Sequence, residues 1–208
     1  MVDFALAQRE QFVEDSDNYY PGLELPLSRE IAFSLDQFFM QHIRHALGAR
    51  RNNGVSCRLS MATLSPQNLH PLQRLCHRDA EVFPPGESMG ASVLYLFKDA
   101  ALGGTSFYKP KKSLDEIRQL LQLASTVSNE ELTSLINASP AYMHASNTYF
   151  ELVCTIPPAW NRAIFYSGTV FHAAQIDRPE LLNADPALGR LTMNGFFKFR
   201  LSSAAMIS

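Results

Sequence analysis

The stretch that decides how this chain is interpreted is Cys76-His77-Arg78-Asp79-Ala80. In an extended strand, residues two apart project from the same face, so His77 and Asp79 would point together into the space above the strand. A neutral imidazole and a carboxylate can be two ligands of one metal ion, and a facial site with open positions needs a third. The stretch therefore predicts part of a metal site.

The third ligand that the sequence offers is His172, which ends the run Tyr166-Ser167-Gly168-Thr169-Val170-Phe171-His172. Two histidines and one carboxylate are the ligand set of non-haem Fe(II) oxygenases. A His-x-Asp pattern also arises by chance, and a histidine at a strand end is often a solvated or hydrogen-bonded residue. The elements around these three residues therefore have to decide between the two interpretations.

The bulk properties of the chain exclude several classes of function. The 208 residues, 46% hydrophobic and 18% charged, fit one soluble globular domain over 1–208. A formal net charge of −2 provides no basic field for nucleic acid or an acidic membrane, and no apolar run is long enough to span a bilayer. The N-terminus lacks a basic region followed by an apolar core, and the three cysteines form no C-x-x-C pair. We therefore expect a cytoplasmic protein with reduced thiols.

The N-terminal part of the chain has mixed signals. We expect residues 1–27 to form an extended arm that packs across the domain. A helix should begin after the N-cap Ser28 and end near Leu47, before Gly48. His42 and His45 on this helix could be an H-x-x-H ligand pair, although partly exposed imidazoles at a helix end are the simpler interpretation.

Strand patterns dominate the rest of the sequence. Apolar residues alternate from Val55 to Leu64, which places Arg58 on the opposite face, where it either meets an anionic ligand in a pocket or is solvated. The apolar run 91–97 predicts a strand at the centre of a sheet. We expect turns at 50–54 and 82–86, and further strands at 76–80, 105–108, 148–156, 162–166, 170–174 and 190–201.

Two helices should interrupt this strand-rich region. Ser113 and Ser128 each open a capping box, which predicts helices that end near Ala124 and Ala138. We interpret 113–145 as a helical insertion that covers one edge of the sheet or acts as a lid over a site.

The order of these elements resembles the double-stranded β-helix, or jelly-roll, of Fe(II)/2-oxoglutarate-dependent dioxygenases. The motif of that superfamily is His-x-Asp/Glu, then a distal histidine, then Arg-x-Ser/Thr. The resemblance implies an α+β, mainly β fold in which His77, Asp79 and His172 are catalytic iron ligands. It also implies that Arg190 binds the distal carboxylate of 2-oxoglutarate, with Thr192 as its hydroxyl helper.

The chain is also similar to an uncharacterised bacterial family of this fold that is found alongside tryptophan-halogenase-like flavoenzymes. We expect a small-molecule substrate and, from the charge and hydropathy of the chain, no nucleic-acid or membrane partner, while a flavoenzyme partner and a homodimer stay open. The segments that carry it span most of the chain from residue 60 onward: 73–79, 103–108, 161–166 and 189–197.

The resembled superfamily also suggests a reaction type. There, 2-oxoglutarate and oxygen occupy the metal positions that the protein leaves free, and the protein supplies placement and shielding. Radical halogenases of this fold lack the carboxylate that Asp79 would provide, so hydroxylation or desaturation of a small molecule or an amino-acid side chain is expected. Asn161, Tyr95 and Tyr108 are plausible pocket residues beside the metal, although a core or surface position is the simpler interpretation of each.

Three alternatives stay open at this stage. Arg190 lies 18 positions after His172, so residues 177–189 must form an excursion between adjacent strands; otherwise Arg200 or Lys198 becomes the rival anchor, or 2-oxoglutarate is not bound. The chain could instead be a catalytically silent jelly-roll module that serves a partner such as a flavin-dependent halogenase. It could also be a cupin-like metal isomerase or hydrolase that uses the same ligands without oxygen.

Overall fold

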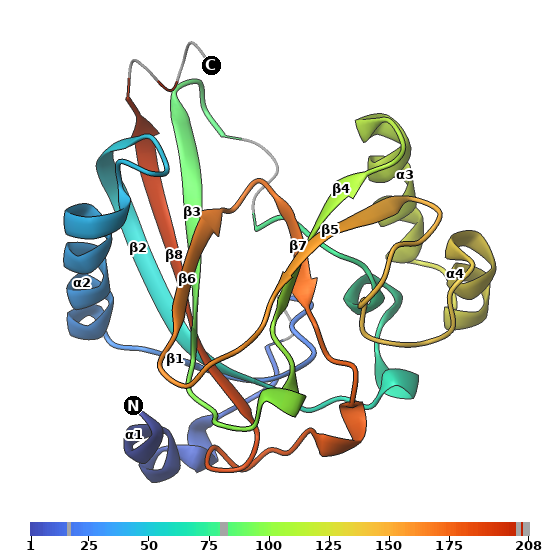
Figure 1. Cartoon of the computed structure of the whole chain (residues 1–208), viewed down its shortest axis with the longest axis horizontal. Helices are drawn as coiled ribbons and strands as arrows, with labels where there is room; N and C mark the ends of the chain where they lie inside the picture. The colour runs from blue at the N-terminus through green and yellow to red at the C-terminus, as the bar shows by residue number, and fades with distance from the viewer. Residues whose placement is uncertain (16–17, 80–82, 203–204, 206–208) are drawn as a thin grey trace.

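The computed structural model describes residues 1–15, 18–79, 83–202 and 205, so Ala80 of the metal-candidate stretch and Val82 of the expected turn lie outside the described residues. Two antiparallel sheets face each other (Figure 1). The larger has the strand order β1-β2-β8-β3-β6 and the smaller has the order β5-β4-β7. The strands are β1 (Gly22–Pro26), β2 (Ala49–Ala62), β3 (Glu87–Tyr95), β4 (Thr105–Pro110), β5 (Phe150–Ile156), β6 (Ala163–Ser167), β7 (Phe171–Ala174) and β8 (Arg190–Leu201).

The helices lie outside the two sheets. The α-helices are α1 (Val2–Ala7), α2 (Arg29–Phe38), α3 (Leu114–Ala124) and α4 (Asn129–Ile136), and α2 continues as a π-helical turn over Phe39–Ile43. Short 3-10 turns occur at Arg9–Gln11, Pro66–Asn68, Pro71–Arg74, Ala100–Leu102 and Pro179–Leu181. Among the described residues, none of the helices has both the length and the apolar character that a membrane crossing requires.

The path of the chain between the sheets defines a double-stranded β-helix, as predicted. After β2 in the larger sheet, the chain reaches β7 of the smaller sheet through an isolated bridge between His77 and His172. It then returns to the larger sheet for β3, forms β4 and β5 in the smaller one, and alternates again through β6, β7 and β8. The fold is α+β and mainly β, with one layer of strands on each side of a central space.

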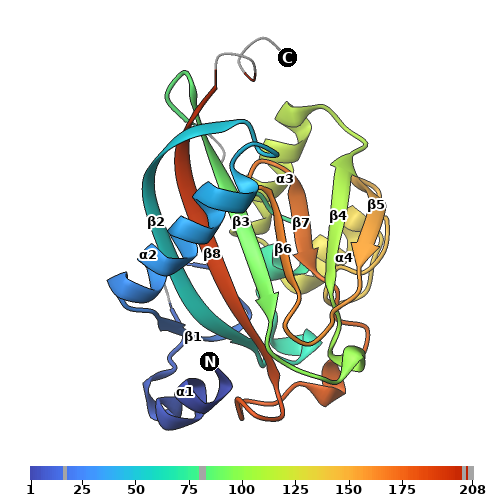
Figure 2. The same ribbon diagram turned by 60° about the vertical axis from the view of Figure 1, so that its left-hand side comes forward.

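The larger sheet has an apolar outer face and a polar inner face. Successive side chains of a strand point to opposite faces, so β8 separates its residues into two sets. The odd-numbered set packs outward against α2, the π-helical turn and the N-terminal segment: Leu191, Met193, Phe197 and Phe199. Figure 2 shows α2 lying across the outer side of β2 and β8. The even-numbered set faces the smaller sheet: Arg190, Thr192, Asn194 and Phe196.

The smaller sheet has its own covering layer. Tyr108, Phe150 and Phe171 on its outer face form one buried cluster with Ile117 of α3 and Leu132 of α4. The insertion thus covers a face of this sheet and not the edge that the sequence suggested (Figure 1). Both predicted capping boxes are present, at Ser113 and Ser128.

Two predictions for the N-terminal third were wrong. Residues 1–27 are not an extended arm, because they begin with α1 and end with β1, which pairs with β2. The expected turn at 50–54 is instead the first part of β2, which pairs with β8 through two register irregularities. In both places the partner strand, distant in sequence, supplies the hydrogen bonds that overrule a weak local signal.

Candidate metal centre

The structure brings His77, Asp79 and His172 to one point between the two sheets. Each offers one ligand atom, and these atoms all lie within 4.8 Å of one another. The Nε2 atoms of His77 and His172 lie 3.9 and 3.6 Å from Oδ1 of Asp79, distances that are too long for hydrogen bonds. The three groups converge without binding directly to one another.

The local backbone that presents these ligands differs from the sequence prediction. Residues 76–79 do not form a regular strand; His77 pairs with His172 through two backbone hydrogen bonds of 2.9 Å, and Asp79 N donates to Gly168 O at 2.9 Å. A Cβ built on Gly168 would lie 3.3 Å from Cβ of Asp79, so the glycine allows this close approach. The ligand-bearing segment is therefore positioned by β7 and by the turn before it.

Burial controls the charge state of the two imidazoles. The His172 side chain is buried, and desolvation lowers its pKa to about 4. The His77 side chain lines the cavity and is 58% accessible, and desolvation followed by the charge of His172 lowers its pKa to about 4. Both rings are neutral at pH 7, which is the form that binds metals.

Asp79 supplies the test of whether a cation fits. Desolvation raises the pKa of its carboxyl, and the charges of His77 and Arg58 partly oppose that shift. Its Oδ2 atom is buried and has no hydrogen-bond partner among the described residues. His172 Nδ1 lies 3.1 Å from Val170 O, which turns Nε2 toward the carboxylate. An unpartnered carboxylate oxygen beside two neutral imidazoles fits a bound divalent cation.

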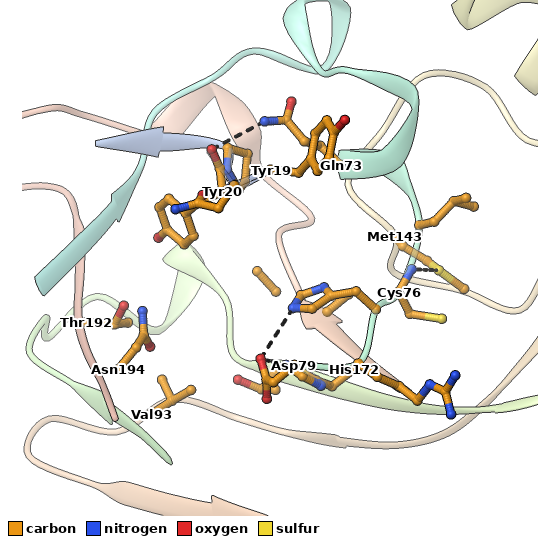
Figure 3. A pocket seen from close by; sticks show the side chains of 18 of the residues that line it. Tyr19, Tyr20, Gln73, Cys76, Asp79, Val93, Met143, His172, Thr192 and Asn194 are labelled. Atoms are coloured by element: carbon orange, nitrogen blue, oxygen red, sulfur yellow. Dashed lines mark hydrogen bonds and ion pairs between the residues drawn. The ribbon is translucent and has the colours of Figure 1, made fainter. Parts of the chain in front are cut away.

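A cavity of about 510 Å³ extends from these three residues across the inner face of the larger sheet. Figure 3 shows Asp79 and His172 at one side, Thr192 and Asn194 on another wall, and Tyr19 and Tyr20 opposite. Gln73 donates to Tyr20 O at 3.3 Å, which ties the tyrosine segment to the chain that leads to His77. The cavity is large enough for a small molecule beside a metal ion.

Arg190 and Thr192 both line this cavity. Arg190 is buried, and its Nε and Nη2 donate to the backbone oxygens of Gly103 and Gly104 at 3.3 and 2.7 Å. Thr192 Oγ1 donates to Ser60 O at 3.3 Å. The rivals that the sequence left open do not line the cavity: Arg200 pairs with Glu87 at 3.8 Å on the surface, and Lys198 is exposed.

The chain between His172 and Arg190 does not join adjacent strands, contrary to the sequence expectation. It crosses from β7 in the smaller sheet to β8 in the larger one. Gly189 donates to Asp185 O at 2.7 Å just before β8 begins, which ends the loop in a tight turn. The long spacing is therefore a connection between sheets, and Arg190 keeps a place in the cavity.

The three possible pocket residues that the sequence offered are core or surface residues, which was the simpler interpretation of each. Tyr95 is fully buried with its hydroxyl bonded to Thr105, Tyr108 points to the outer cluster and donates to Met143 O, and Asn161 forms a turn with φ +60°. The tyrosines that line the cavity are Tyr19, Tyr20, Tyr142 and Tyr166. The Tyr166 ring lies 4.7 Å from the His172 ring, and its position on a short apolar strand carried no sequence signal for this role.

The other histidines have separate surroundings. His42 packs its ring on Phe38 at 4.8 Å on the surface of the helix, and His45 is exposed. His77, Asp79 and His172 form the only cluster of three or more potential metal ligands among the described residues. His42 and His45 are exposed and belong to no such cluster, which agrees with the simpler interpretation of this pair.

Comparisons with known proteins identify the family. The chain matches the model of DUF6445, a family of unknown function, over residues 1–197. The protein belongs to this family. No curated protein sequence matches the chain.

Two solved structures resemble it at low identity. One is a Pseudomonas putida prolyl-4-hydroxylase, with 15% identity and a TM-score of 0.45 over 96% of this chain and 85% of that one. The other is a prolyl 4-hydroxylase from Phytophthora capsici, with 10% identity and a TM-score of 0.45. The match covers 100% of this chain and 60% of that one.

Proposed function

We propose that this protein is an Fe(II)- and 2-oxoglutarate-dependent dioxygenase that hydroxylates a small molecule or an amino-acid side chain. The observation that carries the proposal is the meeting of His77, Asp79 and His172 within 4.8 Å at the wall of a cavity of about 510 Å³. Two imidazoles and one carboxylate are the facial ligand set of non-haem Fe(II) oxygenases.

The protein's part in this function is to hold the metal and to orient its ligands. His172 and His77 would bind through Nε2, because Nδ1 of His172 faces Val170 O and Nε2 of each ring faces Asp79. Asp79 would bind through its carboxylate, whose Oδ2 has no hydrogen-bond partner among the described residues. When bound, iron and its cosubstrate supply the activation of oxygen and the abstraction of hydrogen from the substrate.

Arg190 is the group that we assign to the distal carboxylate of 2-oxoglutarate. The carbonyls of Gly103 and Gly104 hold its Nε and Nη2, which leaves Nη1 without a hydrogen bond to a described residue. Thr192 and the hydroxyl of Tyr20 stand beside it, and burial raises the pKa of Tyr20 to about 12. A permanently charged guanidinium with neutral hydroxyl donors suits a carboxylate.

The experiment that tests this function has two parts. We expect metal-free protein to bind Mn(II) in calorimetry, and the loaded protein to bind N-oxalylglycine, an unreactive mimic of 2-oxoglutarate. Fe(II)-loaded protein in air should release succinate from 2-oxoglutarate, even without a substrate. The variant H172A should lose all three properties, while H42A, which removes an exposed histidine in the π-helical turn after α2, should keep them.

Two results would replace the proposal. Metal binding without succinate release would favour the accessory-module hypothesis, in which a flavoenzyme partner supplies the chemistry. Turnover of a substrate under anaerobic conditions would favour the metal isomerase or hydrolase. If no divalent metal binds, the proposed function is wrong.

A further inference from the structure

The cavity contains a cation that the proposed function does not use. Of the described residues that line it, three are arginines and one, Asp79, is a carboxylic acid. Arg190 is assigned to the cosubstrate, and Arg78 lays its guanidinium over the outward-facing ring of Phe171 at 4.9 Å. The third is Arg58, on β2.

Arg58 is held in place by two contacts. Its Nε forms an ion pair with Oε1 of the buried Glu24 at 2.8 Å, and its guanidinium lies over the Phe196 ring, 4.9 Å from the ring centre. Glu24 is itself fixed, because it accepts hydrogen bonds from Ser60 at 2.8 Å and from Asn18 at 2.7 Å. A guanidinium that is held in one orientation loses little freedom when it binds a ligand.

The terminal amino groups of Arg58 remain available. No hydrogen bond or ion pair joins them to a described residue, and 30% of the side chain is accessible. Arg58 also borders a smaller hollow on its other side, where Glu14, Asp15 and Glu24 contribute carboxylates. An anion would be repelled from that hollow and attracted to the main cavity, which the charge of Asp79 alone opposes.

The register of the larger sheet places Arg58 at the metal end of the cavity. Arg58 pairs with Asn194 on β8, which pairs with Val93 on β3. The next inward-facing row holds Phe196 and Ala91, and it ends at Tyr166, whose ring lies 4.7 Å from that of His172. Arg58 is therefore one row from Tyr166 along the strands, and it lies three strand spacings, roughly 14 Å, from Tyr166 across the sheet.

The same register separates Arg58 from Arg190. Arg190 pairs with Ala62, four residues from Arg58 along β2, which is roughly 13 Å of strand. The two guanidinium groups begin from separate rows of the sheet, so we assign them to two different anions. The cavity thus offers two anion sites, one on each side of its polar wall.

We propose that Arg58 binds an anionic group, a carboxylate, on the substrate that is oxidised at this site. This inference rests on the proposed function, because it takes the triad as the reacting centre and Arg190 as the cosubstrate anchor. The substrate would be a small organic acid whose carboxylate meets the terminal amino groups of Arg58. Its remaining surface would lie against the apolar lining, which includes Leu72, Val93 and Leu121.

The test compares acids with their uncharged amides. The acids are butyrate, hexanoate and benzoate, and each is compared with its carboxamide by ligand-detected NMR. One titration series uses protein that is loaded with Zn(II) in place of Mn(II) and saturated with N-oxalylglycine, and a second series uses metal-free protein. We expect at least one acid to bind at least tenfold more tightly than its amide. R58Q should remove that preference and change the Kd of N-oxalylglycine less than about twofold. The control R51Q replaces an exposed arginine on the same strand and should change neither the preference for acids nor the Kd of N-oxalylglycine.

A second variant protects the test against misfolding. R58Q leaves the buried Glu24 without its cation, so the double variant R58Q/E24Q keeps the network neutral and should also lose the preference for acids. The inference is overturned if no acid is preferred by the wild-type protein, if the preference survives in both variants, or if R58Q weakens N-oxalylglycine as much as the acids. If the wild-type protein binds neither metal nor N-oxalylglycine, the proposed function is refuted. The titrations of metal-free protein would still show whether Arg58 binds a carboxylate.

Discussion

Arg74 and the pair His77 and Asp79 lie within one short segment, yet their polar groups differ: both terminal amino groups of Arg74 are hydrogen-bonded and only its buried Nε has no hydrogen-bond partner among the described residues. The terminal amino groups of Arg74 make four hydrogen bonds with the α4 region: to Asn129 O, Asn129 Oδ1, Thr133 Oγ1 and Ala138 O, at 2.8 to 3.0 Å. Asp79 keeps a buried oxygen without a partner among the described residues, and the His77 ring opens into the cavity. The first region fixes the fold, and the second is free to bind a ligand.

The largest expected effect is on metal binding. H172A should weaken Mn(II) binding by more than about 1000-fold, since losing one of three ligands should exceed the 10- to 100-fold effect of losing an outer partner. Wild-type protein at a Mn(II) concentration 100 times Kd should gain about 2.7 kcal/mol of stability, or roughly 5–10 °C in Tm. Calorimetry and thermal melts measure both values. If H172A binds Mn(II) with an unchanged Kd, the His77 and Asp79 region is not a metal site and does not differ from the Arg74 region in this way.

The next effect should fall on stability alone. R74M keeps the bulk of the side chain and removes its hydrogen bonds, so we expect the free energy of unfolding to fall by about 3 kcal/mol. Urea unfolding measures this change, and Mn(II) affinity of the folded fraction should stay within about twofold. R118M is the matched control, because Arg118 pairs only with the exposed Asp115 at 2.6 Å and should contribute less than about 0.5 kcal/mol.

Asp79 provides a change of opposite sign. D79N removes a buried, unpartnered carboxylate oxygen and keeps the size of the side chain. We expect metal-free D79N to be more stable than metal-free wild type by about 1 kcal/mol, while its Mn(II) binding is lost. Urea unfolding in the presence of a chelator decides the first point. A loss of stability of more than about 1 kcal/mol would mean that Asp79 belongs with Arg74 as a structural group.

The smallest expected effect concerns a hydrogen bond that joins the two sheets. Tyr95 is fully buried in the larger sheet, and its hydroxyl lies 2.8 Å from Thr105 Oγ1 in the smaller one. Y95F should lower the free energy of unfolding by about 1 kcal/mol and leave metal affinity unchanged. Y19F, at a tyrosine that is 55% exposed, is the control and should have no measurable effect.

Local signals in the sequence determined many of the elements correctly. Ser28, Ser113 and Ser128 each cap the helix that follows, because a serine hydroxyl satisfies a free backbone N–H at a helix start. Alternation over 190–201 matches β8 from Arg190 to Leu201, since one face of that strand is buried against α2. The motif at 76–79 also directed attention to the three residues that meet in space.

The tertiary structure alone decided how those elements pair and what surrounds the site. Pairing with β8 extends β2 through a stretch that resembles a turn, and a bridge to His172 positions His77 without a strand. The alternation over 55–64 left open whether Arg58 faces a pocket. Arg58 and Tyr20 line the cavity because β2 pairs with β8, and β1, which follows Tyr20, pairs with β2. Periodicity and capping depend on residues a few positions apart, whereas pairing and cavity lining depend on contacts between distant segments, so only the folded chain specifies them.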